Sequence, residues 1–277
     1  MDFVSYAQLS QDVQEFCKTL KKPVLIVGIR KSGMIPAVMM AKFWDVHVMN
    51  DDEFERCYVN SKIQGLVYMV DDSMLRGDTM LKQMNMYVDT PLNIKYLVMY
   101  DSDAEHKNEL MSYSPFKELS RGRIFQWNLW NHKSLMHITC MDIDGVLCRP
   151  PTYEENDDGD NYIKFLSETE VWFKPTHQVG ALVTARLIKY KQETINWLDK
   201  HNIKFRNLIM LNCPDAETRR RLGLHARYKA EVYKHLDSIL FVEDEPGQAA
   251  RINYLTKKPV LCVSNWKIYN EVLGNEK

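Results

Sequence analysis

Short apolar runs rich in β-branched residues alternate along this chain with segments of helical periodicity. The first half has such runs at 24–27, 66–70 and 94–100, with helical patterns at 34–43 and 80–88 between them. Strands that alternate with helices fold as crossover units around a parallel sheet, because a tight turn cannot join two parallel strands. The pattern therefore predicts an α/β fold whose ligands bind beyond the carboxyl ends of its strands.

A second series of the same kind follows a polar and aromatic stretch at 101–132. Its expected strands lie at 135–141, 179–183, 208–211, 239–242 and 260–263, and its expected helices at 188–200, 229–236 and 248–255. The length of 277 residues exceeds the size at which a single core usually stops growing. We expect two Rossmann-like α/β domains with mostly parallel sheets, at 1–132 and 133–277.

The composition excludes several classes of protein. Lys and Arg number 36 and Asp and Glu 37, so the overall charge does not favour a protein that coats nucleic acid. Six cysteines occur without a Cys-x-x-Cys pair, which argues against a zinc knuckle or a disulfide framework and favours the reducing cytoplasm. No apolar run approaches membrane-spanning length, so we expect no membrane partner.

Two turns of the first series have residues suited to a sugar phosphate. Residues 28–33, Gly-Ile-Arg-Lys-Ser-Gly, join a strand to a helix, where backbone N–H groups and the helix dipole favour an anion. In the second turn Asp71 and Asp72 precede Gly77-Asp78-Thr79, so carboxylates for vicinal hydroxyls stand beside donors for phosphate oxygens. The alternatives are a glycine turn that serves packing and an acidic helix cap.

Residues 67–79 resemble the signature of the type I phosphoribosyltransferases, which has four apolar residues, two acidic residues and a Gly-x-Thr turn. The variant here is similar to that of the glutamine phosphoribosylpyrophosphate amidotransferases, and residues 28–37 resemble the pyrophosphate loop of the wider family. The resemblance implies that Asp71 and Asp72 hold the ribose hydroxyls of phosphoribosyl pyrophosphate. The other implied contacts are to the 5-phosphate, from Arg76, Gly77, Asp78 and Thr79, and to pyrophosphate, from Arg30, Lys31, Ser32 and Gly33.

The acceptor of the phosphoribosyl group stays open. Trp127 lies where this family builds a hood over its acceptor, and a Trp face suits a flat base. A core or interface Trp is the alternative.

In the second series, Asp142 and Asp144 end an apolar strand in an Asp-Ile-Asp-Gly turn. Their alternation places both carboxylates on one side, where hard oxygen ligands suit Mg²⁺. One carboxylate can attack phosphorus while the other protonates the leaving oxygen. Taken alone, the motif also suits a simple turn.

Three further motifs follow in order: Thr184 after the next apolar strand, Lys229 in a helix, and Glu243-Asp244 at a strand end. The set resembles the haloacid dehalogenase superfamily over residues 135–263. The resemblance implies Asp142 as nucleophile, Asp144 as general acid and base, and Thr184 and Lys229 as phosphate ligands. It implies Mg²⁺ bound by Asp142, by the Asp144 carbonyl, and by Asp244 in preference to Glu243.

Two arginine positions are ambiguous. Arg186 either faces substrate or is a surface or packing residue, and residues 219–221, Arg-Arg-Arg, either contact phosphate or form a solvated helix face. We expect the solvated face.

The motifs together predict a bifunctional enzyme. Its first domain would transfer 5-phosphoribosyl from phosphoribosyl pyrophosphate to a small-molecule acceptor, and its second would hydrolyse a phosphomonoester. The 5-phosphate of the transfer product is one candidate for that phosphomonoester, and whether the two activities are coupled stays open. One alternative makes the first domain a sensor that binds phosphoribosyl pyrophosphate or a nucleotide and regulates the phosphatase. The other makes the phosphatase a nucleic-acid end-processing enzyme, which the near-neutral charge disfavours.

Overall fold

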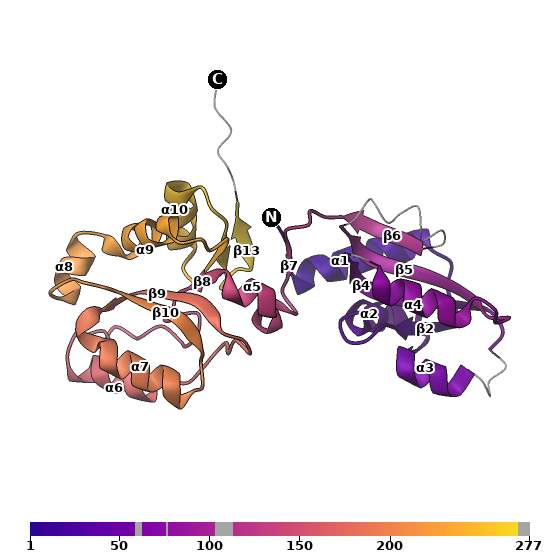
Figure 1. Ribbon diagram of the computed structural model, residues 1–277, viewed down its shortest axis with the longest axis horizontal. Coiled ribbons are helices and arrows are strands. Elements are labelled where there is room, and N and C mark those ends of the chain that lie inside the picture. The colour runs from indigo at the N-terminus through magenta and orange to yellow at the C-terminus, as the bar shows by residue number, and fades with distance from the viewer. Residues whose placement is uncertain (59–62, 76, 103–112, 271–277) are drawn as a thin grey trace, which may run out of the picture. The chain divides into compact units, whose positions relative to one another are not determined.

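The computed structural model describes residues 1–58, 63–75, 77–102 and 113–270 (Figure 1). The chain divides into two compact units, an N-terminal unit Met1–Trp127 and a C-terminal unit Asn128–Lys277. Each is an α/β structure with its own mostly parallel sheet, so the predicted fold class is confirmed. The division lies a few residues before the expected domain boundary at 132/133, and independent folding of each domain stays a prediction.

The main sheet of the N-terminal unit has five parallel strands in the order β3–β2–β4–β5–β6. Their bounds are β2 Leu25–Gly28, β3 His47–Asn50, β4 Leu66–Met74, β5 Asn93–Asp101 and β6 Tyr113–Glu118. A separate parallel pair joins β1 (Asp2–Val4) to β7 (Arg123–Phe125). The helices are α1 Tyr6–Thr19, α2 Met34–Trp44, α3 Asp51–Tyr58 and α4 Asp78–Tyr87.

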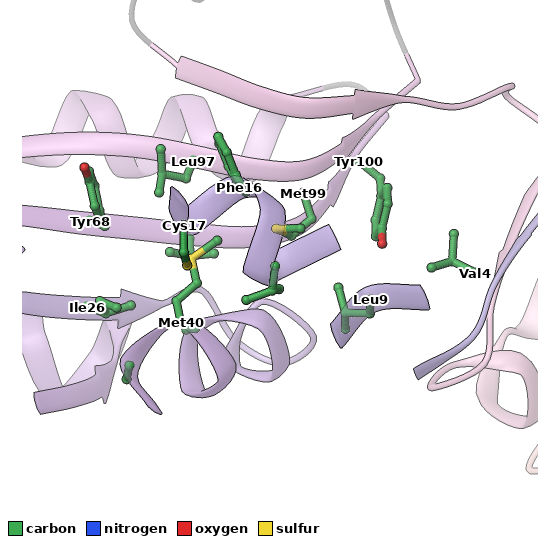
Figure 2. Close-up of a cluster of buried hydrophobic side chains, with 14 of the residues drawn as sticks. Val4, Leu9, Phe16, Cys17, Ile26, Met40, Tyr68, Leu97, Met99 and Tyr100 are labelled. Atoms are coloured by element: carbon green, nitrogen blue, oxygen red, sulfur yellow. The ribbon is translucent and has the colours of Figure 1, made fainter. Parts of the chain in front are cut away.

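Both faces of this sheet are buried. Helices α1 and α2 cover one face, where Leu9, Phe16 and Met40 pack against strand residues that include Ile26 and Tyr68 (Figure 2). On the other face Phe54 of α3 and Met80 of α4 pack against a second set that includes Val27, Val67 and Met69. Neighbouring strand residues thus enter opposite clusters, and this explains why the strands are continuously apolar and not alternating.

Strand β4 is longer than the sequence predicts. We expected a turn to begin at Asp71, but the strand continues to Met74 because β5 is long enough to pair with it. The pairs are Asp71 with Val98, Ser73 with Tyr100 and Met74 with Asp101. Asp71 and Asp72 are therefore consecutive strand residues, whose side chains point to opposite faces of the sheet.

The C-terminal unit has a six-stranded sheet in the order β10–β9–β8–β11–β12–β13, parallel except for β13 at one edge. The strands are β8 Thr139–Met141, β9 Val179–Leu187, β10 Phe205–Leu211, β11 Leu240–Glu243, β12 Val260–Cys262 and β13 Lys267–Tyr269. The helices are α5 Lys133–His137, α6 Asp160–Glu168, α7 Lys191–Lys200, α8 Ala216–Arg221, α9 Leu224–His235 and α10 Pro246–Thr256. Helices α9 and α10 lie on one side of the sheet and α6 and α7 on the other (Figure 1).

Two strand boundaries of this unit differ from the sequence prediction. The strand expected at 135–141 begins only at Thr139, because residues 133–137 form helix α5, which the His132 side chain caps by accepting from the Leu135 N–H at 3.2 Å. A short apolar run does not distinguish a buried strand from a buried helix turn. Strand β9 extends past Thr184 and Arg186 to Leu187, so these two residues lie within the strand and not after it.

In the part of the chain that the structure describes, no helix combines the length and apolar character needed to cross a membrane.

Candidate active sites

A pocket of about 280 Å³ in the C-terminal unit contains residues from all four motifs of the second series. We call it the aspartate pocket. Strand β8 lies between β9 and β11, so residues at the carboxyl ends of these three strands meet at one edge of the sheet. The motif residues that line the pocket are Asp142, Asp144, Thr184, Lys229 and Asp244.

Lys229 reaches this edge from helix α9 and joins two carboxylates. Its ammonium donates to Asp142 Oδ2, to Glu243 Oε2 at 2.8 Å and to Gln248 Oε1 at 3.0 Å. The side chain is only 2% exposed, and two adjacent carboxylates offset the cost of burying its charge. Burial raises the pKa of Asp142 above its ordinary value, and the adjacent Lys229 ammonium opposes the shift.

Asp144 is held by Arg186, two residues beyond Thr184 on β9. The Arg186 guanidinium donates to both Asp144 oxygens, with Nη2 2.6 Å from Oδ1 and Nε 3.1 Å from Oδ2. Arg186 is 1% exposed and also lies near the Trp197 ring, so the surface alternative for this arginine is wrong. Because β9 continues past Thr184, the alternation of strand side chains points Thr184 and Arg186 to the same side.

The turn after Asp144 depends on a glycine. Gly145 has φ +78°, and a Cβ built on it would lie 1.9 Å from Asp244 Oδ2. Any other residue would therefore displace the Asp244 carboxylate. Burial, with repulsion from Glu243 and Asp142, raises the pKa of Asp244 to about 8.

The carboxylates fit a divalent cation. Asp142, Glu243 and Asp244 each offer one ligand atom, and these atoms lie within 4.8 Å of one another. Both Glu243 oxygens are already used, Oε2 by Lys229 and Oε1 by the N–H groups of Asp244 and Glu245 at 3.1 and 3.3 Å. Asp244 lines the pocket, whereas Glu243 is completely buried. Asp244 thus faces the pocket with a carboxylate, while Glu243 is engaged by Lys229 and two backbone N–H groups; the preference for Asp244 as the ligand stays a prediction.

Arg219 and His225 also line the pocket, although neither was among the site residues expected from the sequence. Arg219 is 6% exposed, so the solvated face expected at 219–221 is wrong for this residue, while Arg220 and Arg221 are exposed. Helix α8 turns one of the three arginines inward. Arg219 lies three residues after Ala216, which is also buried, and this i, i+3 spacing is the signal that places both on one face of the helix. The pKa of His225 is lowered to about 4 by burial and by the nearby cations Arg219 and Lys229.

In the N-terminal unit a pocket of about 270 Å³ lies where β4 leads into α4. We call it the Gly77 pocket. Gly77 has φ +78° and precedes the first turn of α4, a conformation that favours glycine. The predicted residues Asp71, Gly77, Asp78 and Thr79 line this pocket. Arg76, the remaining predicted 5-phosphate ligand, lies outside the described residues.

Asp72 does not line the Gly77 pocket, although the sequence paired it with Asp71. It is 5% exposed, and the Trp127 indole donates to its Oδ2 at 2.7 Å. Trp127 also stacks on Phe125 with ring centroids 4.8 Å apart. Burial raises the pKa of both aspartates, and repulsion from Asp72 raises that of Asp71 further.

The predicted pyrophosphate loop lies next to Asp71. A Cβ built on Gly33 would lie 2.6 Å from the Val70 carbonyl oxygen and 2.9 Å from Asp71 Cα, so only glycine allows this approach. In the same loop Lys31 is exposed and Ser32 is half-buried. Arg30 donates from Nε to Asp51 Oδ1 at 2.8 Å and also pairs with Asp52, both in the first turn of α3.

No protein-family model and no curated protein matches the sequence. Among solved structures the chain is similar to a purine phosphoribosyltransferase from Pyrococcus horikoshii Ot3, with 16% identity over 46% of this chain and 92% of that one and a TM-score of 0.37. A hypothetical protein from Neisseria gonorrhoeae with bound ppGpp matches at 13% identity over 46% of this chain and 89% of that one, TM-score 0.39. The xanthine-guanine-hypoxanthine phosphoribosyltransferase of Helicobacter pylori matches with 14% identity over 46% of this chain and 92% of that one, and the TM-score is 0.37. Similarity at this level assigns neither a family nor an activity to the chain.

Proposed function

We propose that the C-terminal unit hydrolyses a phosphomonoester with the help of Mg²⁺, and that the N-terminal unit transfers 5-phosphoribosyl from phosphoribosyl pyrophosphate to a small-molecule acceptor. One observation supports the first activity above all: residues from four motifs far apart in the sequence line the single aspartate pocket. Carboxylates, a buried ammonium and a hydroxyl at one strand edge are the groups that phosphoryl transfer to an aspartate requires.

In the proposed reaction an Asp142 carboxylate oxygen attacks phosphorus, and the bond from phosphorus to the leaving oxygen breaks. Hydrogen bonds from Lys229 to Oδ2 and from the Ile143 N–H to Oδ1, at 2.7 Å, hold the carboxylate in one orientation. Asp144, protonated at the start, donates its proton to the leaving oxygen and later takes a proton from the attacking water, and Arg186 fixes its position. Water then splits the aspartyl phosphate, which releases inorganic phosphate and restores Asp142.

Mg²⁺ would be held by Asp142, Asp244 and the Asp144 carbonyl. When bound, it offsets the negative charge of the carboxylates and of the phosphate. Thr184, 1% exposed, is the expected hydroxyl donor to a phosphate oxygen. The three N–H groups of Lys229 already donate to Asp142, Glu243 and Gln248, so Lys229 would contact the phosphate by exchanging one of these partners.

Hydrolysis of para-nitrophenyl phosphate tests this activity. Asp142→Asn should abolish turnover without unfolding the protein, because an amide cannot carry the phosphoryl group. EDTA should stop the reaction and added Mg²⁺ should restore it. Asp199→Asn, an exposed position on α7, is the matched control and should retain full turnover. Turnover by Asp142→Asn, or a rate indifferent to EDTA, would refute the assignment.

The transferase proposal rests on the Gly77 pocket, which combines Asp71 with the glycine, aspartate and threonine of a phosphate-binding turn. Gly33 brings the second loop against Asp71. Donors for a phosphate and a carboxylate for ribose hydroxyls thus lie together, as phosphoribosyl pyrophosphate requires.

Two contacts favour a second candidate, a sensing role without turnover. Asp72 is already hydrogen-bonded to Trp127, and Arg30 is already paired with Asp51 and Asp52. Two of the predicted ligand residues would have to exchange partners before they could contact substrate. A unit that binds phosphoribosyl pyrophosphate and does not release pyrophosphate would fit this arrangement.

Pyrophosphate release distinguishes the two candidates. Calorimetry with phosphoribosyl pyrophosphate and Mg²⁺ measures binding, and release is then assayed across a panel of nucleobases and a metabolite extract. A transferase releases pyrophosphate with at least one acceptor, and Asp71→Asn abolishes release. If the protein binds phosphoribosyl pyrophosphate, Asp71→Asn weakens this binding and no acceptor of the panel causes release of pyrophosphate, the sensing role is established. Absence of binding would refute both.

The two activities would be coupled if the 5-phosphate bound in the Gly77 pocket is later hydrolysed in the aspartate pocket. Asp142→Asn should then accumulate a phosphoribosylated acceptor, whereas the unaltered protein should yield the riboside and free phosphate from the same mixture. Mass spectrometry separates these products. An unaltered protein that stops at the phosphorylated product has two independent activities.

A further inference from the structure

Arg219 is a buried cation on the wall of the aspartate pocket. It lies on helix α8 and is 6% exposed, whereas its neighbours Arg220 and Arg221 point to solvent. Its Nη1 donates to the Ala185 carbonyl at 2.7 Å, and its Nη2 lies 3.5 Å from Asn156 Oδ1. Ala185 stands between Thr184 and Arg186, so the guanidinium lies beside the expected phosphate-binding strand end.

The charge of Arg219 is not compensated. Among residues 1–58, 63–75, 77–102 and 113–270 no carboxylate pairs with it, and its buried Nε has no hydrogen-bond partner. The other two cations of the pocket are paired, Arg186 with Asp144 and Lys229 with Asp142 and Glu243. A buried charge without a counter-ion is unfavourable, so an arginine in this position indicates an anion that arrives from outside the chain.

Arg219 lies on α8, an element that carries none of the residues proposed for the chemistry. The reacting carboxylates and Thr184 come from the strand ends, whereas Arg219, Asn156 and His225 come from α8, from the segment before α6, and from α9. For the transferring phosphate the strand ends offer the Thr184 hydroxyl, and Lys229 can add a donor by exchanging one of its three partners. A wall that adds a guanidinium, an amide and an imidazole suits another part of the substrate.

We propose that Arg219 binds a second anionic group of the phosphatase substrate, which is therefore a phosphomonoester that also carries a carboxylate or another phosphate. This inference rests on the proposed phosphatase function. The planar guanidinium presents paired N–H donors that match the oxygens of either anion, and Arg219 has donors beyond the two it uses. Arg219 is thus a specificity residue, and substrates with a neutral leaving group bind without its contribution.

Binding of unreactive phosphonates tests the inference without relying on turnover. Benzylphosphonates carrying a carboxylate or a second phosphonate at the ortho, meta or para position are compared with the matching carboxamides, by calorimetry with Mg²⁺ present. The unaltered protein should bind at least one charged member about 10-fold or more tightly than its carboxamide, as one charge-assisted hydrogen bond predicts. Comparing the carboxylate and phosphonate series identifies which anion is preferred.

The preference is the ratio of the affinity for a charged benzylphosphonate to the affinity for its carboxamide. Arg219→Gln should reduce this ratio to about 1 and leave the affinity for the carboxamide unchanged. Arg220→Gln removes a charge from an exposed position of the same helix and should retain the preference. If Arg219→Gln does not fold, Arg219→Lys keeps the charge without the paired donors and should lower the preference partially.

Three results would overturn the inference. The first is equal binding of charged and carboxamide ligands by the unaltered protein, and the second is no binding of either. The third is an equal loss of both in the Arg219 variants, which would show that Arg219 holds the transferring phosphate. Hydrolysis of plain benzyl phosphate and of benzyl phosphates that carry a carboxylate or a second phosphate is measured separately. Absence of hydrolysis of all of them refutes the phosphatase proposal, while the binding ratio still decides whether Arg219 binds an anion.

Discussion

The Arg186 guanidinium lies against the Asp144 carboxylate in the aspartate pocket, with Nη2 2.6 Å from Oδ1. The Arg186 side chain is completely buried, and that of Asp144 is 20% exposed. One partner of the pair is thus sealed in the protein while the other reaches the pocket. Asp144 is therefore both accessible to a ligand and held in one position, as the proposed transfer of a proton to and from the substrate requires.

Removal of Arg186 should destabilise the protein and stop hydrolysis. We expect Arg186→Ala to lower the free energy of unfolding by about 3 kcal/mol or more, because it breaks a buried ion pair and leaves a cavity. Urea unfolding measures this, and Arg220→Ala should change the value by less than about 0.5 kcal/mol. A double variant with Asp144→Ala should lose less than the sum of the single changes. Additive losses would mean that the pair is not coupled.

Glu243 and Asp244 should have separable roles. Asp244→Asn should weaken Mg²⁺ binding at least about 10-fold, because it removes a pocket-lining ligand. Glu243→Gln should weaken Mg²⁺ binding less and destabilise the fold more, because Lys229 loses a buried partner at 2.8 Å. Mg²⁺ titration by calorimetry and urea unfolding measure the two effects. The reverse pattern would make Glu243 the metal ligand.

Gly33→Ala should disturb the contact between the two loops of the N-terminal unit. Its Cβ would lie 2.6 Å from two backbone oxygens, that of Ile29 just after β2 and that of Val70 within β4, so the backbone of both segments would have to shift. We expect a loss of about 1–3 kcal/mol in stability, as for other overpacked sites, together with weaker binding of phosphoribosyl pyrophosphate. Gly122→Ala meets nothing within 4 Å and should leave both unchanged. If Gly33→Ala and Gly122→Ala have the same stability and the same affinity for phosphoribosyl pyrophosphate, the close approach of Gly33 to the Val70 backbone is refuted.

His225 should make the protein less stable as the pH falls from about 6.5 towards 4. Its pKa is lowered to about 4 in the folded chain, so the folded state binds fewer protons than the unfolded state across this range. The stabilisation is complete above the unfolded pKa and is lost as the pH falls to the folded one. Urea unfolding of His225→Gln at pH 7 and pH 5 should show a smaller drop than the unaltered protein. An identical drop would mean that His225 is not shielded from protons.

The sequence by itself determined the class of fold and the order of the motifs. Both follow from local properties: apolar runs such as 24–27 form strands wherever they are buried, and a residue such as Asp142 that directly follows a strand must lie at its carboxyl end. Thr184 and Lys229 were singled out by the order of the motifs along the chain, and their expected roles came from the resemblance to the haloacid dehalogenase superfamily.

Only the tertiary structure decided which of these residues share a pocket and what holds them. Whether β4 stops at Val70 or continues to Met74 depends on the length of its partner β5, and within the strand Asp71 lines the Gly77 pocket while Asp72 accepts from Trp127. The burial of Arg186 depends on Asp144, which precedes it by a long stretch of chain, and the burial of Arg219 depends on how α8 is rotated against β9. Contacts of this kind join residues distant in sequence, and local periodicity has no information about them because it reflects only neighbours along the chain.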